Sequence, residues 1–249
     1  MKKHAARIPV FLILALLVLV TLGPILWVLV SSLKTQGEML ISPWALPKTP
    51  MWENYATAWK KGHFLSLAKN SLLVTAFSLL FMLLFSTMAA FGIARCKRAL
   101  SRYTLDYLLI GQTVSAAMIV FPIVLILRGM GLKDSLLGLG LTYIAGGIPF
   151  ATFVLQGFLA GIPGEIYEAA EIDGASEFCL FTHIGLPLAK PALATVLLYQ
   201  FMWVWNEFPL AFTLISTTSK RTLIVGLYSV VNGSLQTNYV LAFAGAVKG

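Results

Sequence analysis

Long uncharged runs of apolar residues dominate the chain and predict its secondary structure. A helix needs about 20 residues to cross the hydrocarbon layer of a bilayer, and several runs reach or approach that length. The pattern therefore predicts an all-α fold, a polytopic membrane helix bundle with five clear spans. These are residues 8–33, 71–94, 107–127, 135–164 and 191–206, the last continuing through Glu207 and Pro209 to about residue 218.

One further uncharged stretch, residues 222–247, differs from these runs because polar side chains interrupt its middle. A lipid-facing helix would leave such groups without hydrogen-bond partners. The sequence therefore leaves a sixth crossing open, as a shortened span or none. The interrupting residues are Asn232, Gly233, Ser234, Gln236, Thr237 and Asn238.

Basic residues near the predicted spans indicate the orientation of the chain. Cytoplasmic loops are enriched in Lys and Arg, and both the first flank and the connection after the second span are basic. We therefore predict a cytoplasmic N-terminus, although the connection before residue 71 also contains lysines, most of them farther from the membrane. The two basic groups are Lys2, Lys3 and Arg7, then Arg95, Lys97, Arg98 and Arg102.

Composition supports a membrane protein. Of 249 residues, 58% are hydrophobic and only 11% are charged, too few to cover a water-soluble domain. The net charge of +8 comes from short basic clusters between the apolar runs, which fits anionic lipid and predicts no nucleic acid partner. Cys96 and Cys179 lie far apart without metal-ligand spacing, so no metal site is expected.

The predicted cytoplasmic connection at residues 159–190 contains five of the ten acidic residues. Pro163 suits the first turn of a helix, and Gly174 suits a left-handed cap at its end. Between them, three acids follow at three-residue steps on one face, with an apolar face beside it formed by Ile166, Ala169 and Ile172. A second helical stretch is expected from Ser176. The acids are Glu165, Glu168 and Glu171.

The same connection matches a spaced family pattern of EAA, three residues, G, nine residues and I-x-L-P. The matching residues are Glu168, Ala169, Ala170, Gly174, Ile184, Leu186 and Pro187. The chain thereby resembles the permeases of ABC importers that carry an EAA loop. Residues 172–176 and 186–188 are similar to the carbohydrate branch, in particular to the smaller permease subunit of maltose-type, binding-protein-dependent importers. Further similarity lies in residues 70–71, 205–208 and 245–249.

This resemblance implies a role in transport for the whole chain, as a single permease domain over residues 1–249 with a coupling loop at residues 159–190. The seven matching residues would dock onto an ATPase subunit. Glu168 would pair with a basic residue there, Ala169 and Ala170 would permit close approach, and Gly174 would make the turn. The solutes implied are sugars or sugar-like molecules.

The partners implied by the resemblance are a second permease subunit in a heterodimer, two ATP-binding subunits and an extracellular solute-binding protein, in a bacterial inner membrane that the chain crosses several times. The sequence contains no G-x-x-x-x-G-K-[ST] loop, so it predicts no cofactor in this chain and assigns ATP to the partner subunit. It also lacks the H-E-x-x-H and G-x-S-x-G signatures, which argues against an enzyme.

The end of the chain departs from the family pattern. Members carry a full helix before the terminal tail, but here only residues 240–244 separate the two matching stretches, too few to cross a membrane. Either the sixth span is missing, or residues 222–247 serve as a shortened one whose polar middle is buried against a partner.

Three other interpretations stay open at this stage. Asn206 and Glu207 could line the translocation path, or Glu207 could lie near the outer interface after Trp205. Gly157 and Gly161 form a G-x-x-x-G pair that could pack the fourth span closely. An ion-coupled transporter or a channel is the alternative function, although it would usually place more ionisable residues within the spans.

Overall fold

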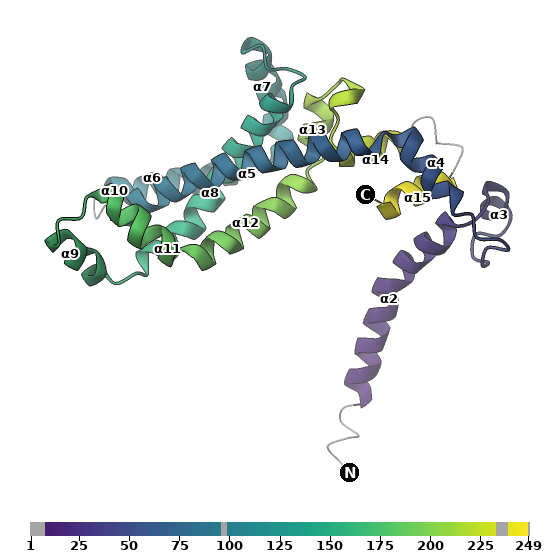
Figure 1. Cartoon of the computed structure of the whole chain (residues 1–249), viewed down its shortest axis with the longest axis horizontal. Coiled ribbons are helices and arrows are strands. Elements are labelled where there is room, and N and C mark those ends of the chain that lie inside the picture. The colour runs from purple at the N-terminus through teal and green to yellow at the C-terminus, as the bar shows by residue number, and fades with distance from the viewer. Residues whose placement is uncertain (1–7, 96–98, 233–238, 249) are drawn as a thin grey trace. The chain divides into compact units, whose positions relative to one another are not determined.

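The computed structural model describes residues 8–95, 99–232 and 239–248, and its regular elements in these ranges are all helical (Figure 1). The predicted all-α class is therefore confirmed. The chain forms two compact units, one comprising Met1–Ser66 with Val225–Gly249 and the other Leu67–Ile224. Several residues used in the predictions lie outside the described ranges: Lys2, Lys3, Arg7, Cys96, Lys97, Arg98, Gly249 and the polar stretch 233–238.

The first unit is built around α2 and its last helix. Its helices are α2 (Ile8–Ser32), α3 (Gln36–Ile41), α4 (Glu53–Gly62), most of α14 (Leu223–Asn232) and α15 (Tyr239–Lys248). Helix α15 packs against α2, α3 and α4. Thr35 and Glu38 cap the start of α3 reciprocally, each side chain accepting from the other residue's backbone N–H. The buried Lys34 ammonium donates to the carbonyls of Ser42 and Pro43, which provides acceptors for two of its three N–H groups away from water.

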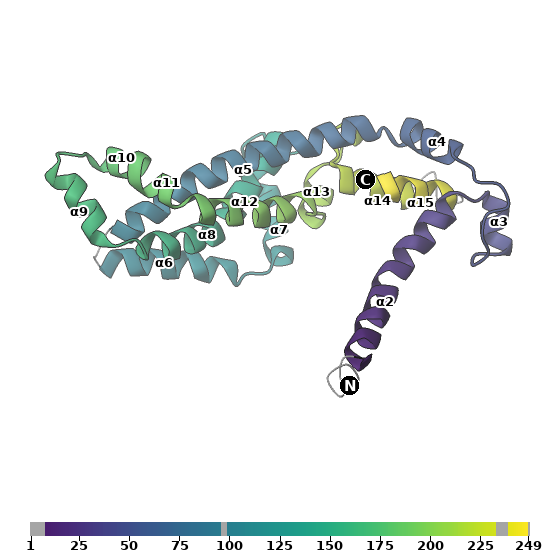
Figure 2. The same ribbon diagram turned by 60° about the horizontal axis from the view of Figure 1, so that its bottom comes forward.

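The second unit contains α5, the longest of the described helices, and most of the other elements. Its elements are α5 (Phe64–Arg95), whose first turn belongs to the other unit, then α6 (Ala99–Gln112), α7 (Ala116–Gly129), α8 (Leu136–Ala160), α9 (Gly164–Ile172), α10 (Glu177–Cys179), the π-helix η1 (Leu180–Gly185), α11 (Leu186–Leu188), α12 (Lys190–Trp205), α13 (Pro209–Leu214) and the 3-10 turn η2 (Thr218–Lys220). Helices α5, α8 and α12 run side by side in both views (Figures 1 and 2).

Three helices in the described residues are long and apolar enough to cross a membrane: Ile13–Ser32, Phe64–Arg95 and Leu136–Ala160. A fourth crossing is possible if Glu177–Leu188 and Lys190–Trp205, bent by 71° at their junction, form one span. The described residues therefore contain three or four candidate spans by length and composition.

The third predicted span, residues 107–127, is not one continuous helix. Helix α6 ends at Gln112 and α7 begins at Ala116, with Ser115 in extended backbone between them. The Thr113 hydroxyl and the Thr113 N–H both bond to the carbonyl of Ile110, which ends the first helix locally. Apolarity alone did not reveal this break.

Small residues bring α5 and α8 close together. The Ser78 hydroxyl donates to the carbonyl of Gly140 at 3.3 Å, and the Gln200 amide of α12 donates to the carbonyl of Gly147 at 3.0 Å. A methyl group on Gly140 would lie 2.7 Å from the Phe77 ring. Helices in lipid pack through such small residues and interhelical hydrogen bonds. Gly157, of the G-x-x-x-G pair left open in the sequence, has open space at its Cβ position and so makes no close helix contact among the described residues.

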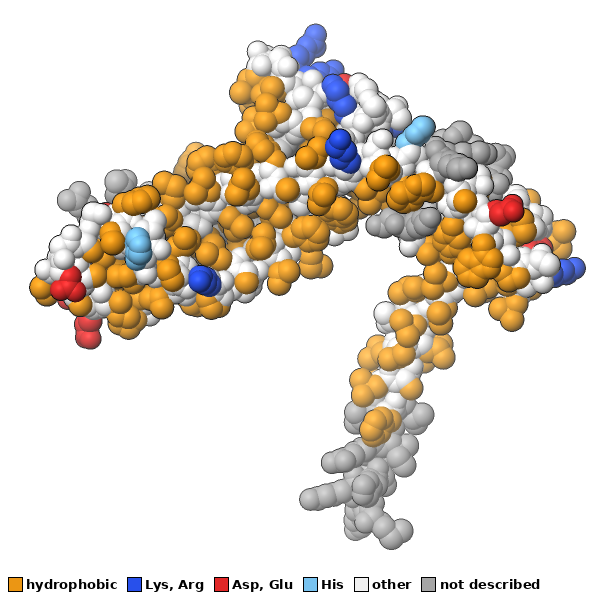
Figure 3. Space-filling model, in the orientation of Figure 1, with side chains coloured by type: hydrophobic (Ala, Val, Ile, Leu, Met, Phe, Trp, Pro, Cys, Tyr) orange, Lys and Arg blue, Asp and Glu red, His pale blue; other side chains and the backbone are white. Residues whose placement is uncertain are grey.

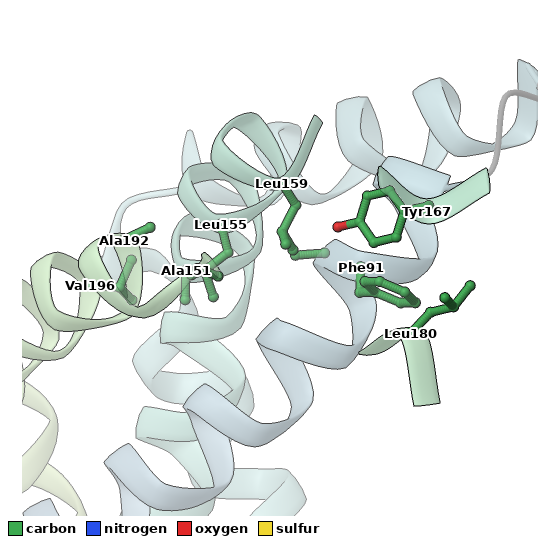
Figure 4. Packing of buried hydrophobic residues seen from close by; sticks show 10 residues of the cluster. Phe91, Ala151, Leu155, Leu159, Tyr167, Leu180, Ala192 and Val196 are labelled. Atoms are coloured by element: carbon green, nitrogen blue, oxygen red, sulfur yellow. The ribbon is translucent and has the colours of Figure 1, made fainter. Parts of the chain in front are cut away.

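Apolar side chains cover most of the visible flank of the second unit, whereas acidic side chains gather at its α9 end (Figure 3). A cluster of buried residues lies beneath that end, where α5, α8, α9 and η1 converge (Figure 4). Its members include Phe91, Leu155, Leu159, Tyr167 and Leu180. This core holds α9 in place, so the polar surface of α9 is anchored from below.

Candidate functional site

The residues of the EAA pattern lie on one helical hairpin, formed by α9 and the α10–η1–α11 stretch. Pro163 occupies the cap position before α9, with φ of −55° and ψ of 131°, so the prediction that it lies in the first turn is off by one residue. Gly174 has φ of +82°, which confirms the predicted left-handed cap. The N–H of Ala175 reaches the carbonyl of Ala170 at 2.9 Å and closes the end of the helix.

The side chains of α9 divide into an exposed surface and one buried anchor. Glu168 and Ala169 are exposed and Ala170 is half-buried, so an acid and small side chains face outward together. Ile172 beside them is 87% exposed. The apolar face formed by Ile166, Ala169 and Ile172 is therefore exposed, and the buried residue of α9 is Tyr167.

Tyr167 fastens α9 to the membrane helices. Its ring meets the ring of Phe91 edge to face, with centroids 6.1 Å apart (Figure 4). Phe91 makes a similar contact with Phe181 of η1 at 5.3 Å. Burial raises the pKa of the Tyr167 hydroxyl above its ordinary value, although the nearby Arg95 acts in the opposite direction. The phenol is therefore neutral at physiological pH, and its role is packing.

The second half of the hairpin turns the chain back toward α12. Ser176 caps α10 by accepting from the N–H of Cys179 at 3.3 Å. Ile184 and Leu186 are half-buried, whereas Pro187 is exposed within α11. Gly185 passes so close to Phe91 that a methyl group there would lie 2.9 Å from the ring. The I-x-L-P residues thus form the base of the hairpin, and Glu168, Ala169 and Gly174 form its outer part.

Arg95, the last residue of α5, joins both halves of this hairpin. Its guanidinium makes ion pairs with Glu171 of α9 and Glu177 of α10, and it lies over the Tyr167 ring at 5.0 Å from the centroid. A pocket of about 490 Å³ opens beside these groups. Its lining residues are Met88, Phe91, Gly92, Arg95, Glu177, Phe178 and Phe181. In the sequence, Arg95 indicated only the orientation of the chain, and these contacts were not predicted.

Asn206 and Glu207 lie at the opposite end of α12 from the hairpin. The Glu207 carboxylate accepts from the Tyr143 hydroxyl at 2.8 Å and from the N–H groups of Leu210 and Ala211 at 2.8 and 3.0 Å. Glu207 therefore caps α13 and ties it to α8. Asn206 is exposed, and its amide donates to the carbonyl of Met202 at 2.8 Å.

A second carboxylate organises the same end of the unit. Asp134, between α7 and α8, accepts from the N–H groups of Ser216 and Thr217 and from the Thr217 hydroxyl, while Lys220 donates to its carbonyl at 2.7 Å. These hydrogen bonds, led by the one from Thr217, lower the pKa of Asp134 to about 2. The carboxylate therefore stays ionised and holds the segment after α13 across the physiological range.

Within the described ranges, no group of three or more His, Cys, Asp or Glu side chains is arranged to hold a metal ion. The residues that stand out are charged pairs and small-residue contacts. This arrangement suits binding and movement of helices, because it provides an anchored, exposed acidic surface and fixed joints between spans.

Comparisons with known proteins agree on one family. The family described as "Binding-protein-dependent transport system inner membrane component" matches residues 82–247. The diacetylchitobiose uptake system permease protein NgcG of Streptomyces coelicolor is 35% identical over 237 residues, covering 94% of this chain and 78% of that protein. The galactooligosaccharides transport system permease protein GanQ of Bacillus subtilis is 30% identical over 240 residues, covering 95% and 84%.

A solved structure has the same fold. It is that of a bacterial ABC transporter involved in the import of the acidic polysaccharide alginate, and one of its chains superposes with a TM-score of 0.85. The match covers 99% of this chain and 91% of that chain at 23% identity. The helical arrangement therefore extends over nearly the whole length of both.

Proposed function

Because this chain belongs to the family of binding-protein-dependent transport system inner membrane components, we propose that its hairpin of α9 to α11 receives the force of an ATP-hydrolysing partner. The chain is a permease subunit of an ABC importer, a multi-pass helical protein of the bacterial inner membrane and not an enzyme. One observation supports the proposal most: Glu168 and Ala169 are exposed on a helix whose base is buried in the core of α5 and α8.

Each residue of the EAA pattern has a role in this proposal. Glu168 pairs with a basic residue of the ATPase, because a carboxylate partly desolvated at an interface is costly to leave unpaired. Ala169 and Ala170 allow the two surfaces to approach closely. Gly174 supplies the left-handed turn that ends α9. Ile184, Leu186 and Pro187 keep the hairpin rigid at its base.

The assembly we propose contains a second permease subunit as a heterodimeric partner, two ATP-binding subunits and an extracellular solute-binding protein. The chain has no nucleotide-binding loop of its own, so the energy must come from a partner. The match to the binding-protein-dependent transport family argues against a stand-alone channel or an ion-coupled transporter.

The solute we propose is an oligosaccharide or a similar sugar. Two relatives are named for the uptake of diacetylchitobiose and of galactooligosaccharides, and a structure of the same fold belongs to an alginate importer. These names describe different sugars, so the proposal stays at the level of the class.

The topology we propose has a cytoplasmic N-terminus and five crossings, with residues 222–247 as a shortened sixth. The α9 hairpin then faces the cytoplasm. Helix α8, at 25 residues, is about 37 Å long, which is enough to place Asp134 at the outer surface. Asn206 and Glu207 remain candidates for the translocation path, with the exposed Asn206 amide the more accessible of the two.

The test is to replace Glu168 with Lys and measure uptake of labelled oligosaccharides by membrane vesicles that contain the whole transporter. We expect uptake to fall at least tenfold and the ATPase to be lost on purification, while the amount of permease in the membrane stays unchanged because Glu168 is exposed. Asp106→Lys makes the same charge change on the exposed surface of α6 and serves as the control. Wild-type uptake in Glu168→Lys would overturn the proposal.

A further inference from the structure

One side chain connects the proposed docking hairpin to a membrane helix through directional contacts. Arg95 ends α5, and its Nη2 donates to the carboxylate of Glu171 and to Oε1 of Glu177, the latter at 3.1 Å. Its Cζ lies 5.0 Å from the centroid of the Tyr167 ring. A single planar group therefore contacts three side chains on both halves of the hairpin.

The chemistry of these contacts favours arginine. A guanidinium presents several N–H donors in a fixed plane, so it can bond two carboxylates while its face rests on an aromatic ring. Arg95 is 24% exposed, and the glutamates are 43% and 70% exposed, so water screens each pair. The contribution of each pair to stability is therefore small, and their value lies in fixing orientation.

The apolar contacts beneath Arg95 do not supply that orientation. Phe91 contacts Tyr167 (Figure 4) and Phe181 through edge-to-face ring pairs, which hold the hairpin against α5. Apolar burial is non-directional, and the geometry that an edge-to-face ring pair prefers adds only about 0.5–1.5 kcal/mol, so small rotations of one surface over another are permitted. Ion pairs at the rim are directional, and they resist rotation of the hairpin about its aromatic anchor.

Helix α5 also reaches the rest of the second unit. From Arg95 it runs back past Phe91 to Ser78, whose hydroxyl bonds to the carbonyl of Gly140 in α8. A force applied to α9 therefore has a continuous route through Arg95 into α5 and from there into α8.

We infer that Arg95 is the positioning residue that locks the docking hairpin to α5, so that a stroke delivered at α9 moves the membrane helices. This inference rests on the proposed docking of α9 onto an ATPase. Without the Arg95 contacts, the ATPase still binds the hairpin and hydrolyses ATP. The hairpin then rotates about the Phe91 ring contacts, and its movement is not transmitted to α5.

The test compares solute transported per ATP hydrolysed in the complete transporter reconstituted into liposomes. We expect Arg95→Gln to lower this ratio at least fivefold while the ATPase still co-purifies, and the double variant Glu171→Gln with Glu177→Gln to behave alike. Arg95→Lys keeps one ion pair and recovers part of the ratio. Lys190→Gln removes an exposed positive charge at the start of α12 and leaves the ratio unchanged.

A covalent replacement separates transmission from folding. In a chain without native cysteines, Arg95→Cys with Glu177→Cys should show the low ratio, and a short bifunctional thiol crosslinker should restore it. An unchanged ratio in Arg95→Gln overturns the inference, as does loss of the ATPase from that variant, because Arg95 would then act in assembly. If no ATPase co-purifies with the wild-type chain, the proposed docking of α9 is wrong, independently of the role of Arg95.

Discussion

The hydroxyl of Tyr143 donates to the carboxylate of Glu207 across 2.8 Å, which joins the first third of α8 to the break between α12 and α13. The same carboxylate accepts the N–H groups of Leu210 and Ala211, two of the donors that the first turn of α13 would otherwise leave without partners. Glu207 therefore has a structural role whether or not it also faces the solute.

The Tyr143–Glu207 hydrogen bond predicts an energetic coupling between the two side chains. Tyr143→Phe should lower the free energy of unfolding by about 1 kcal/mol and Glu207→Ala by about 1–3 kcal/mol, because a partly buried hydrogen bond or helix cap is lost. The double variant should lose less than the sum, by about 0.5 kcal/mol or more. Thermal unfolding in detergent measures all three. Tyr199→Phe is the control, since the Tyr199 ring stacks on Phe150 and is half exposed. If the loss in the double variant equals the sum of the two single losses, the hydrogen bond does not couple the two residues.

The segment after α13 should stay fixed between pH 7 and pH 5. Because the folded-state pKa of Asp134 is lowered to about 2, its contribution is fully present above the ordinary pKa near 3.8 and is lost only as the pH falls toward 2. Hydrogen exchange at the N–H groups of Ser216 and Thr217, corrected for intrinsic rates, should show constant protection in this range. Asp134→Asn should raise exchange at both sites at neutral pH. Protection that disappears near pH 6 in the wild type would be inconsistent with these hydrogen bonds to Asp134.

Gly140, and not Gly157, should control the packing of α8. A methyl group at Gly140 meets the Phe77 ring at 2.7 Å, so Gly140→Ala should destabilise the protein by about 1–3 kcal/mol. Gly157→Ala meets nothing within 4 Å and should be neutral or stabilising by up to about 1 kcal/mol, because alanine favours helix. Denaturation of the two purified variants under one condition makes the comparison, and equal effects would contradict the packing described.

Gly174 should tolerate asparagine better than alanine. Its φ of +82° lies in the left-handed region, where a non-glycine residue costs roughly 1–2 kcal/mol and asparagine suffers least. We expect uptake to decrease in the order Gly, Asn, Ala, by up to about tenfold for Gly174→Ala. If both variants transport like the wild type, the shape of this turn is not needed for coupling.

Local signals in the sequence predicted the hairpin well. Gly174 was identified from its position after a helical pattern, and its backbone has the expected left-handed conformation. The buried residue of α9 was not identified from the sequence. Ile172 is more hydrophobic than Tyr167, and yet the fold exposes the isoleucine and buries the tyrosine. Which face of a short helix points inward depends on its neighbours in space.

Contacts between residues far apart in the chain could not be predicted from the sequence, for a similar reason. Arg95 and Glu171 are 76 residues apart, and Tyr143 and Glu207 are 64 apart. A usable signal did exist for the first pair, because a basic residue at the end of the second predicted span accompanies an unexplained excess of acid at residues 159–190. The break after Gln112 was missed because a polar run of Gln, Thr and Ser still has no charge.

The most direct test of the account is a crosslink from the outer surface of α9. In a chain with Cys96→Ser and Cys179→Ser, Ala169→Cys should form a crosslink to the ATPase subunit whose yield changes with bound ATP, while Ser219→Cys at the other end of the unit should form none. A nucleotide-sensitive crosslink at position 169 is the predicted result. Labelling of that cysteine by a membrane-impermeant reagent added from the periplasmic side, with no crosslink in any nucleotide state, would contradict the central claim.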